Sequence, residues 1–302
     1  MELWIVISVA AAFAQNLRFM LQKHLKATRL STGGATFARF VFAAPLAVLL
    51  VVLLIGLGPY QLPGMTPRFL VFAMAGGVAQ ILATLFVVAL FAERNFTVGI
   101  ALKKTETIQT AIIALVVLGE AVSAWGLIAI AVGLIGVILL SDPPKRAEPR
   151  RWRERLFNKA SGYGLASGAL FGVSATGYRG ASLALDGGDF LIRAALTLAF
   201  VTLFQSVLMA VWLRSREAGE IRKVMQSWKV TALVGLTGVA GSFCWFMAFT
   251  LQNAAYVKAV GQVELVFTFL ASWLVFREKS SGREIAGVGL IVASILLLVL
   301  LH

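Results

Sequence analysis

Residues 32–56 read TGGATFARFVFAAPLAVLLVVLLIG, and Arg39 is the only charged residue in this run. A helix that crosses a bilayer needs about 20 mostly apolar residues, so this stretch predicts one membrane crossing. Similar runs recur along the whole chain. The predicted segments are 3–22, 32–56, 68–91, 97–118, 121–140, 160–184, 188–213, 228–251, 256–276 and 281–301, which makes ten transmembrane helices.

The length of these runs favours helices over the strands of a β-barrel. In lipid, every backbone polar group must bond within the protein, which leaves helices and closed barrels as the possible structures. Barrel strands are about ten residues long and alternate apolar with polar side chains. Because the runs here are longer and mostly unbroken, the sequence predicts an all-α, polytopic membrane protein.

Composition and charge placement lead to the same fold class. Of the 302 residues, 59% are apolar and 14% are charged, whereas a soluble domain has about 25% charged residues. The net charge of +13 does not predict nucleic-acid binding, because most basic residues lie in loops between apolar segments. The single cysteine, Cys244, cannot form an intramolecular disulfide, and the two histidines do not cluster, so no metal or cofactor site is predicted.

The loop charges predict which face of the membrane each loop occupies. The first, third, fifth, seventh and ninth loops carry most of the basic residues, whereas the other loops carry Arg68 alone. Basic residues near helix ends stay cytoplasmic, so we expect both termini outward and the linker 141–159 cytoplasmic, in a bacterial inner membrane. The linker is basic enough to lie on anionic membrane lipids. Ala12-Phe13-Ala14 resembles a signal-peptidase site, but the chain start lacks Lys and Arg, which favours a spanning helix.

Residues 1–140 and 160–302 form two related halves of five predicted helices each. At a constant offset of 158 residues, polar residues of one half recur in the other: Asn95 and Asn253, Glu106 and Glu264, Glu120 and Glu278. An odd number of helices in each half makes the two halves insert in opposite directions. Such inverted repeats are a transporter architecture, with the binding site near the membrane midplane between the repeats.

The last part of each half carries a shared pattern. The steps Gly119-Glu120 and Arg277-Glu278 follow the fourth and ninth segments, and the final helices, 126–140 and 282–301, are rich in glycine. With the five-plus-five helices, this pattern resembles the EamA-type branch of the drug/metabolite transporter superfamily. The resemblance implies a small inner-membrane carrier, often an exporter of amino acids or other metabolites, and not an enzyme.

Two features depart from that family. Thr107 and Leu265 follow Glu106 and Glu264 at positions where relatives commonly have a proline, so we expect the kink of the fourth and ninth helices to be missing. Pro45, by contrast, predicts a kink in the second helix, because proline removes one helical hydrogen bond. Many relatives have cytoplasmic termini, whereas the loop charges predict outward termini here, which leaves the direction of transport open.

Ionisable side chains inside the segments are the candidate functional residues. A charge at the bilayer centre costs at least about 2.5–3.5 kcal/mol, so such a side chain faces a cavity or a partner. Glu106 and Glu264 lie deep in their segments and are expected to flank a central cavity. The basic residues inside the segments are Arg18, Arg39, Lys103, Lys104, Arg179, Arg193 and Lys258.

The candidate substrate-binding residues combine these charges with two aromatic side chains. They are Glu106, Glu264, Lys103, Arg39, Arg193, Arg179, Lys258, Tyr178 and Trp245. Tyr178 and Trp245 would form cavity walls, unless they serve ordinary helix packing. Two other interpretations stay open. Arg18, Arg179 and Lys258 lie near segment ends and could snorkel to the interface. The two glutamates could also pair with Arg39 and Arg193 only to neutralise buried charge.

The excess of positive charge inside the segments favours a ligand with a carboxylate or a phosphate. We therefore expect a secondary transporter of a small anionic or zwitterionic metabolite, of amino acid, organic acid or phosphate type, that works as an exporter or exchanger. A proton or a counter-substrate could drive it, since no ATP-binding motif is present. Multidrug or cation efflux and a lipid-headgroup flippase are the alternatives. An enzyme is not expected, because no nucleophile motif or His/Asp cluster occurs.

Overall fold

The computed structural model describes residues 2–28, 30–90, 102–140, 159–274 and 281–301. Within these ranges the chain folds into helices and no strand, apart from an isolated bridge between Gly64 and Asp186. The all-α prediction is therefore confirmed. The predicted linker up to residue 158, and Asn95, Arg277 and Glu278 of the sequence patterns, lie outside the described residues.

Each predicted segment contains one helix or two helices in succession. Before the linker the helices are α1 (Leu3–Thr28), α2 (Thr32–Val41), α3 (Ala43–Leu57), α4 (Pro67–Leu90), α6 (Glu106–Leu118) and α7 (Ala124–Leu140). After it come α9 (Lys159–Leu183), α10 (Phe190–Arg216), α11 (Glu220–Gln226), α12 (Trp228–Leu251), α13 (Ala254–Gly261), α14 (Val263–Leu274) and α15 (Gly282–Leu301).

Length and apolarity make the chain an integral membrane protein. Among the described residues, six stretches are long and apolar enough to cross a bilayer: Leu3–Gln22, Thr32–Leu57, Pro67–Leu90, Phe190–Arg216, Trp228–Leu251 and Gly282–Leu300. The shorter helices α6 and α7 are also apolar. Large apolar side chains such as Leu57, Val116 and Val207 are exposed, as expected for a surface that faces lipid. The count of ten crossings stays a prediction.

Pro45 interrupts the second predicted segment, as its sequence indicated. α2 ends at Val41 and α3 begins at Ala43, with Phe42 between them. Proline at position 45 has no N–H to donate to the carbonyl of Val41, so the helical ladder breaks there.

The α-helical hydrogen bonding is interrupted just before Glu106 and Glu264, and the missing proline kink stays a prediction. The N–H of Gln262 donates to Ala259 O at 3.2 Å, and the chain then starts a new helix, α14. The N–H of Thr105 donates in the same way to Leu102 O at 3.1 Å, just before α6. These i→i+3 bonds tighten the backbone into a 3₁₀ turn, which interrupts an α-helix without a proline.

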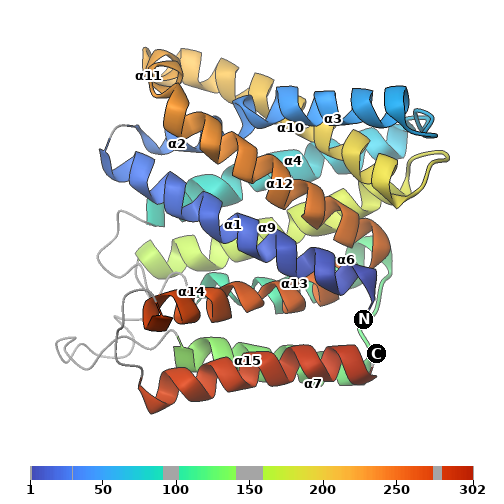
Figure 1. Ribbon diagram of the computed structural model, residues 1–302, viewed down its shortest axis with the longest axis vertical. Coiled ribbons are helices and arrows are strands. Elements are labelled where there is room, and N and C mark those ends of the chain that lie inside the picture. The colour runs from blue at the N-terminus through green and yellow to red at the C-terminus, as the bar shows by residue number, and fades with distance from the viewer. Residues whose placement is uncertain (1, 29, 91–101, 141–158, 275–280, 302) are drawn as a thin grey trace.

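Helices far apart in sequence pack side by side in a bundle with roughly parallel axes (Figure 1). The closest pairs are α4 with α9, α7 with α15, and α1 with α12. Both chain termini lie at the same end of the bundle. Small residues allow the close approach. A Cβ added to Gly177 of α9 would lie 3.0 Å from the Cα of Gly76 on α4, so these two backbones touch.

Candidate functional site

Two interrupted helices bring the buried charges together. Glu106 begins α6 and Glu264 is the second residue of α14, so each carboxylate stands just after a 3₁₀ turn. Lys103 and Lys104 immediately precede α6, and Lys258 lies on α13. The exposed fraction is 7% for Glu106 and 8% for Glu264. The charges are thus inside the bundle and depend on each other for compensation.

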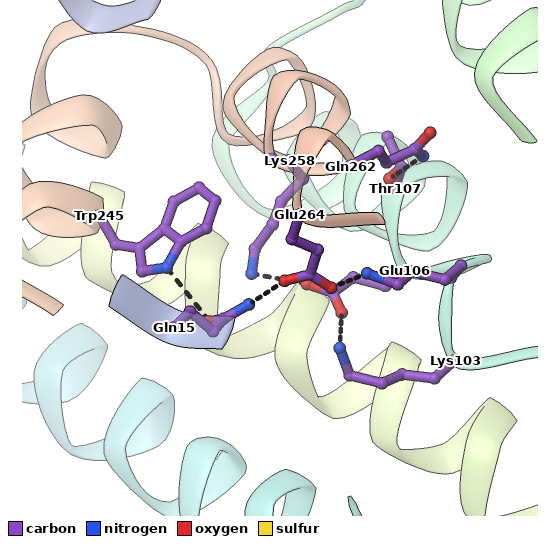
Figure 2. Close-up of a pocket in the computed structure, with 10 residues that line it drawn as sticks. Gln15, Lys103, Glu106, Thr107, Trp245, Lys258, Gln262 and Glu264 are labelled. Atoms are coloured by element: carbon purple, nitrogen blue, oxygen red, sulfur yellow. Dashed lines mark hydrogen bonds and ion pairs between the residues drawn. The ribbon is translucent and has the colours of Figure 1, made fainter. Parts of the chain in front are cut away.

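Glu106 is held between two lysines. Its Oε1 lies 2.6 Å from Lys258 Nζ, and its Oε2 lies 3.3 Å from Lys103 Nζ. Figure 2 shows these side chains converging on the pocket from opposite sides. Because Lys258 and Glu106 are separated by about half the chain, this contact joins the helices before the linker to those after it.

Glu264 accepts from a lysine and from an amide. Lys104 Nζ pairs with Glu264 Oε1, and Gln15 Nε2 donates to Glu264 Oε2 at 2.9 Å. The indole N–H of Trp245 donates in turn to Gln15 Oε1 at 3.2 Å. These contacts run from α12 through α1 to α14 (Figure 2). They fix the orientation of the Glu264 carboxylate.

Close helix packing supports the start of α6. A Cβ added to Gly168 of α9 would lie 2.9 Å from Lys103 O and 3.4 Å from Glu106 N. Glycine at this position therefore lets α9 lie directly against the turn that carries Lys103 and Glu106. A larger residue would push that turn and its charges away.

These charges line a narrow pocket. Gln15, Trp245 and Lys258 also line a second pocket, so the two spaces adjoin. The second pocket has aromatic walls that include Phe171, Tyr178, Phe246 and Phe249. Lys258 Nζ lies 5.0 Å from the centre of the Trp245 ring, and such cation–π contacts stabilise a buried ammonium group.

Tyr178 belongs to a polar network beside the aromatic-walled pocket. Its hydroxyl donates to Gln80 Oε1 at 2.9 Å, and Gln205 Nε2 donates to the same oxygen at 3.0 Å. The Tyr178 ring stacks on Phe246 with the ring centres 4.3 Å apart. Tyr178 and Trp245 thus both line pockets and also pack between helices, so the two interpretations of their role are compatible.

The arginines predicted for the site lie in three different places. Arg39 lines the aromatic-walled pocket and donates to Thr84 Oγ1 at 3.0 Å. Arg179 Nε lies 2.7 Å from both carboxylate oxygens of Glu120, and Arg179 Nη1 donates to Phe249 O. Arg193 is in the first turn of α10 and donates to the carbonyls of two glycines, Gly187 and Gly188.

Two hypotheses about charge pairing are therefore wrong. Lysines, and not Arg39 and Arg193, neutralise the two glutamates, because α6, α13 and α14 bring the lysines closer. Lys258 does not snorkel, since its ammonium group pairs with Glu106. Arg18 is 2% exposed and does not snorkel either. We place Arg179 and Arg193 outside the candidate site, since neither lines the pockets described above.

Three polar residues of the site were not among the predicted substrate-binding residues. Lys104, Gln15 and Gln262 all line the charged pocket, and Gln262 Nε2 donates to Thr107 Oγ1 at 3.0 Å. Each stands inside an otherwise apolar segment, which is a signal that could have identified them. Within the described residues, no group of three or more His, Cys, Asp or Glu side chains gathers as metal ligands do. The site thus offers charge, hydrogen bonds and aromatic surface.

Comparisons with known proteins agree with this architecture. The model of the EamA-like transporter family matches residues 160–300. A solved structure described only as "Crystal structure of protein" is similar with a TM-score of 0.72 at 13% sequence identity, and the similarity covers 99% of both chains. At that identity the likeness concerns the fold alone. No curated protein matches the chain. The predicted relation to the drug/metabolite transporter superfamily is confirmed by the family match.

Proposed function

We propose that this chain, whose residues 160–300 match the EamA-like transporter family, is a secondary transporter of a small anionic or zwitterionic metabolite. The metabolite is of amino acid, organic acid or phosphate type. The observation that carries the proposal is the pocket in which Lys103, Lys258 and Glu106 meet from both sides of the linker. Buried ionisable groups in a membrane protein mark transport pathways, because they cost too much to be kept for packing alone.

In this proposal the chain crosses the membrane ten times and consists of two inverted repeats, 1–140 and 160–302. Helix packing supports it. If the halves correspond, exchanging them turns the pair α1 with α12 into the pair α9 with α4, and both pairs are in close contact. The same exchange maps the contact of α7 with α15 onto itself. The 3₁₀ turns before Glu106 and Glu264 also recur at matching places.

In this proposal the chain lies in a bacterial inner membrane with both termini facing outward. The linker 141–159 then faces the cytoplasm. Support comes from the basic loops and from the position of both termini at one end of the bundle (Figure 1). In this orientation the carrier acts as an exporter or an exchanger, with a proton or a counter-substrate as the coupled species.

Exchange of partners supplies the transport step. A ligand carboxylate or phosphate can replace Glu106 as the partner of Lys103 and Lys258, and a ligand ammonium can approach a released glutamate. Removing one partner of a buried ion pair costs about 3–5 kcal/mol, so an unfilled site keeps its internal pairs and stays closed. A ligand that satisfies both charges opens the site without leaving a charge unpaired.

Transport by the purified full chain in proteoliposomes tests the substrate class. The panel contains amino acids, dicarboxylates, phosphate esters and lipophilic cations, each supplied with and without a pH gradient. We expect saturable transport of an anion or zwitterion and none of the cations. A preference for lipophilic cations would establish the multidrug alternative instead. Movement of fluorescent phospholipid between leaflets, without transport of any soluble solute, would establish the flippase alternative.

A further inference from the structure

Two buried arginines stand side by side away from the glutamates. Arg18 of α1 is 2% exposed and Arg39 of α2 is 4% exposed. Both stems meet α12 at Gly238, where an added Cβ would lie 3.7 Å from Arg18 Cδ and 3.8 Å from Arg39 Cγ. Glycine at this position thus leaves room for two long cationic side chains at one place in the bundle.

Neither guanidinium has a carboxylate partner among the residues that the structure describes. Arg39 donates to the hydroxyl of Thr84, and Arg18 makes a long contact of 3.5 Å with Gln22 Oε1. A guanidinium carries five N–H donors, so most of the donors of each arginine are unused by these contacts. The Arg18 group also lies over the Phe19 ring, 4.4 Å from its centre.

The buried carboxylates nearby are already committed. Glu106 is shared by Lys103 and Lys258, and Glu264 pairs with Lys104. Two adjacent positive charges in a low-dielectric interior repel each other, and each carries its own desolvation cost. An anion between them would remove both penalties. The arrangement is therefore one that an anionic ligand stabilises more than any neutral ligand does.

The space beside Arg39 is polar and has an unused acceptor. Arg39 lines the aromatic-walled pocket and a further small pocket, which it shares with Gln80 and Gln205. Gln205 is fully buried, its Nε2 makes three hydrogen bonds, and its Oε1 has no partner. A buried acceptor without a donor costs free energy. The pocket thus offers the Arg39 guanidinium for an oxyanion and an acceptor for a ligand O–H or N–H.

We infer that Arg18 and Arg39 form an anion subsite, separate from the Glu106–Glu264 cluster, that binds the carboxylate or phosphate of the transported ligand at a different step from its pairing with Lys103 and Lys258. Gln205 then accepts a hydrogen bond from a neighbouring hydroxyl or amino group of that ligand. The inference rests on the proposed function and specifies its substrate class. A hydroxy acid, an amino acid or a hydrogen phosphate has the required pair of groups. A simple dicarboxylate lacks the donor.

Binding to the purified full chain in nanodiscs of phosphatidylcholine tests the subsite. The probes are inorganic phosphate, malate and succinate, compared with chloride at equal pH and ionic strength. The measurement is the shift of the thermal-unfolding midpoint as each probe is titrated. We expect malate and phosphate to raise the midpoint, and succinate, which lacks the hydroxyl donor, to bind more weakly than malate.

Substitutions locate the binding to the two arginines. Arg18→Gln and Arg39→Gln should each weaken binding roughly 10- to 100-fold, the value of a lost charge-assisted hydrogen bond. Arg39→Lys should be intermediate, because an ammonium group cannot bind an oxyanion in the same forked geometry. Arg68→Gln, which removes an exposed cation, should bind as the unchanged protein does.

Stability without ligand separates a binding role from a structural role. Arg18→Gln and Arg39→Gln should raise the ligand-free midpoint, because each removes an uncompensated buried charge. An arginine kept only for packing would have the opposite effect. A lower ligand-free midpoint in both variants, unchanged binding in both, or equal midpoints of the unchanged protein in phosphate, malate and chloride would overturn the inference.

A second set of nanodiscs identifies the source of the anion. If phosphatidylglycerol raises the midpoint through Arg39 while free phosphate does not, the subsite holds a lipid phosphate. Arginine-dependent binding without any transport would leave the subsite in place and refute the proposed function. Transport that depends on Glu106 and Glu264 but is unaffected by Arg18→Gln and Arg39→Gln would support the proposed function and refute the subsite.

Discussion

Lys258 Nζ lies 2.6 Å from Glu106 Oε1 and thereby joins α13 to α6 across the linker. Lys103 approaches the other oxygen of the same carboxylate, at 3.3 Å. The contact is buried, so solvent does not screen it, and neither partner can lose the other without leaving a charge unpaired. This contact sets the closed state of the pocket and determines what a ligand must replace.

Removing Lys258 should destabilise the protein more than removing the whole pair. Lys258→Gln leaves Glu106 with one lysine and is expected to cost about 3 kcal/mol, whereas Glu106→Gln combined with Lys258→Gln should recover most of that loss. The measurement is a double-mutant cycle of unfolding midpoints in detergent. Additive effects of the two substitutions would show that the pair is not coupled.

The contact between Arg179 and Glu120 should act as a closure at one end of the pathway. It holds α9 to the loop after α6, and Arg179 also binds a carbonyl of α12. If Arg179→Gln or Glu120→Gln lowers the stability of the closed state by about 1–2 kcal/mol relative to the open state, the open population rises roughly five- to thirtyfold. The test introduces Ser242→Cys, in a pocket wall, with Cys244→Ala, and measures labelling by a membrane-impermeant maleimide.

In that background, Arg179→Gln and Glu120→Gln should each accelerate labelling of the cysteine at position 242. Arg68→Gln provides the control, because its exposed cation lies outside the pockets. Equal labelling rates in all three variants would mean that the Arg179 contact does not limit access.

Glu220 should make stability depend on acidic pH. The N–H of Ser31 donates to its carboxylate, and Lys223 Nζ lies 3.1 Å away. Burial raises the pKa of Glu220, but these contacts outweigh it and hold the pKa below the ordinary value of 4.5. Because the folded-state pKa is the lower one, the stabilisation is present above the unfolded-state pKa and is lost as pH falls through the folded-state value.

Glu220→Gln should therefore lower the unfolding midpoint at pH 7, and the difference from the unchanged protein should shrink as pH falls below about 4.5. Thermal unfolding followed from pH 7 to pH 3 measures this difference. Glu284→Gln is the matched control, since glutamine can replace glutamate at this position near the start of α15. A gap that stays constant with pH would show that the Glu220 carboxylate does not contribute through its charge.

Gly168 should be required for the position of the charged turn. Gly168→Ala places a Cβ 2.9 Å from the carbonyl of Lys103, a clash expected to cost about 1–3 kcal/mol. Gly162→Ala is on the same helix and meets no atom within 4 Å, so it should be neutral. Unfolding midpoints of the two variants check this. Equal stability would mean that α9 does not confine the turn.

The sequence predicted the helical membrane fold and the two buried glutamates, because both depend on local composition. A long apolar run has few possible structures in lipid, and Glu106 inside such a run needs a cavity or a partner. Partners were harder to predict. Lys258 and Glu106 meet through tertiary packing, which no local pattern contains. Arg193 was expected at the centre, but α10 begins at Phe190 and leaves Arg193 in the first turn.

The interrupted helices near Glu106 and Glu264 show the same limit of the sequence. Absence of proline after Glu106 and Glu264 predicted continuous helices, yet both segments tighten at Thr105 and Gln262. An α-helix can be interrupted without proline, and here Gln262, at one interruption, donates to Thr107 on a helix of the other half. That contact joins the two halves, so the sequence of either segment alone cannot predict it.

Solute transport by glutamate variants in proteoliposomes is the most direct test of the central site. Glu106→Gln and Glu264→Gln should each lower the initial rate of transport at least about tenfold, since each loses about 1.4 kcal/mol or more of charge compensation. Glu284→Gln, which keeps the hydrogen bonding at the start of α15, should transport as the unchanged protein does. Wild-type rates in both Glu106→Gln and Glu264→Gln would contradict the assignment of these carboxylates to the transport site.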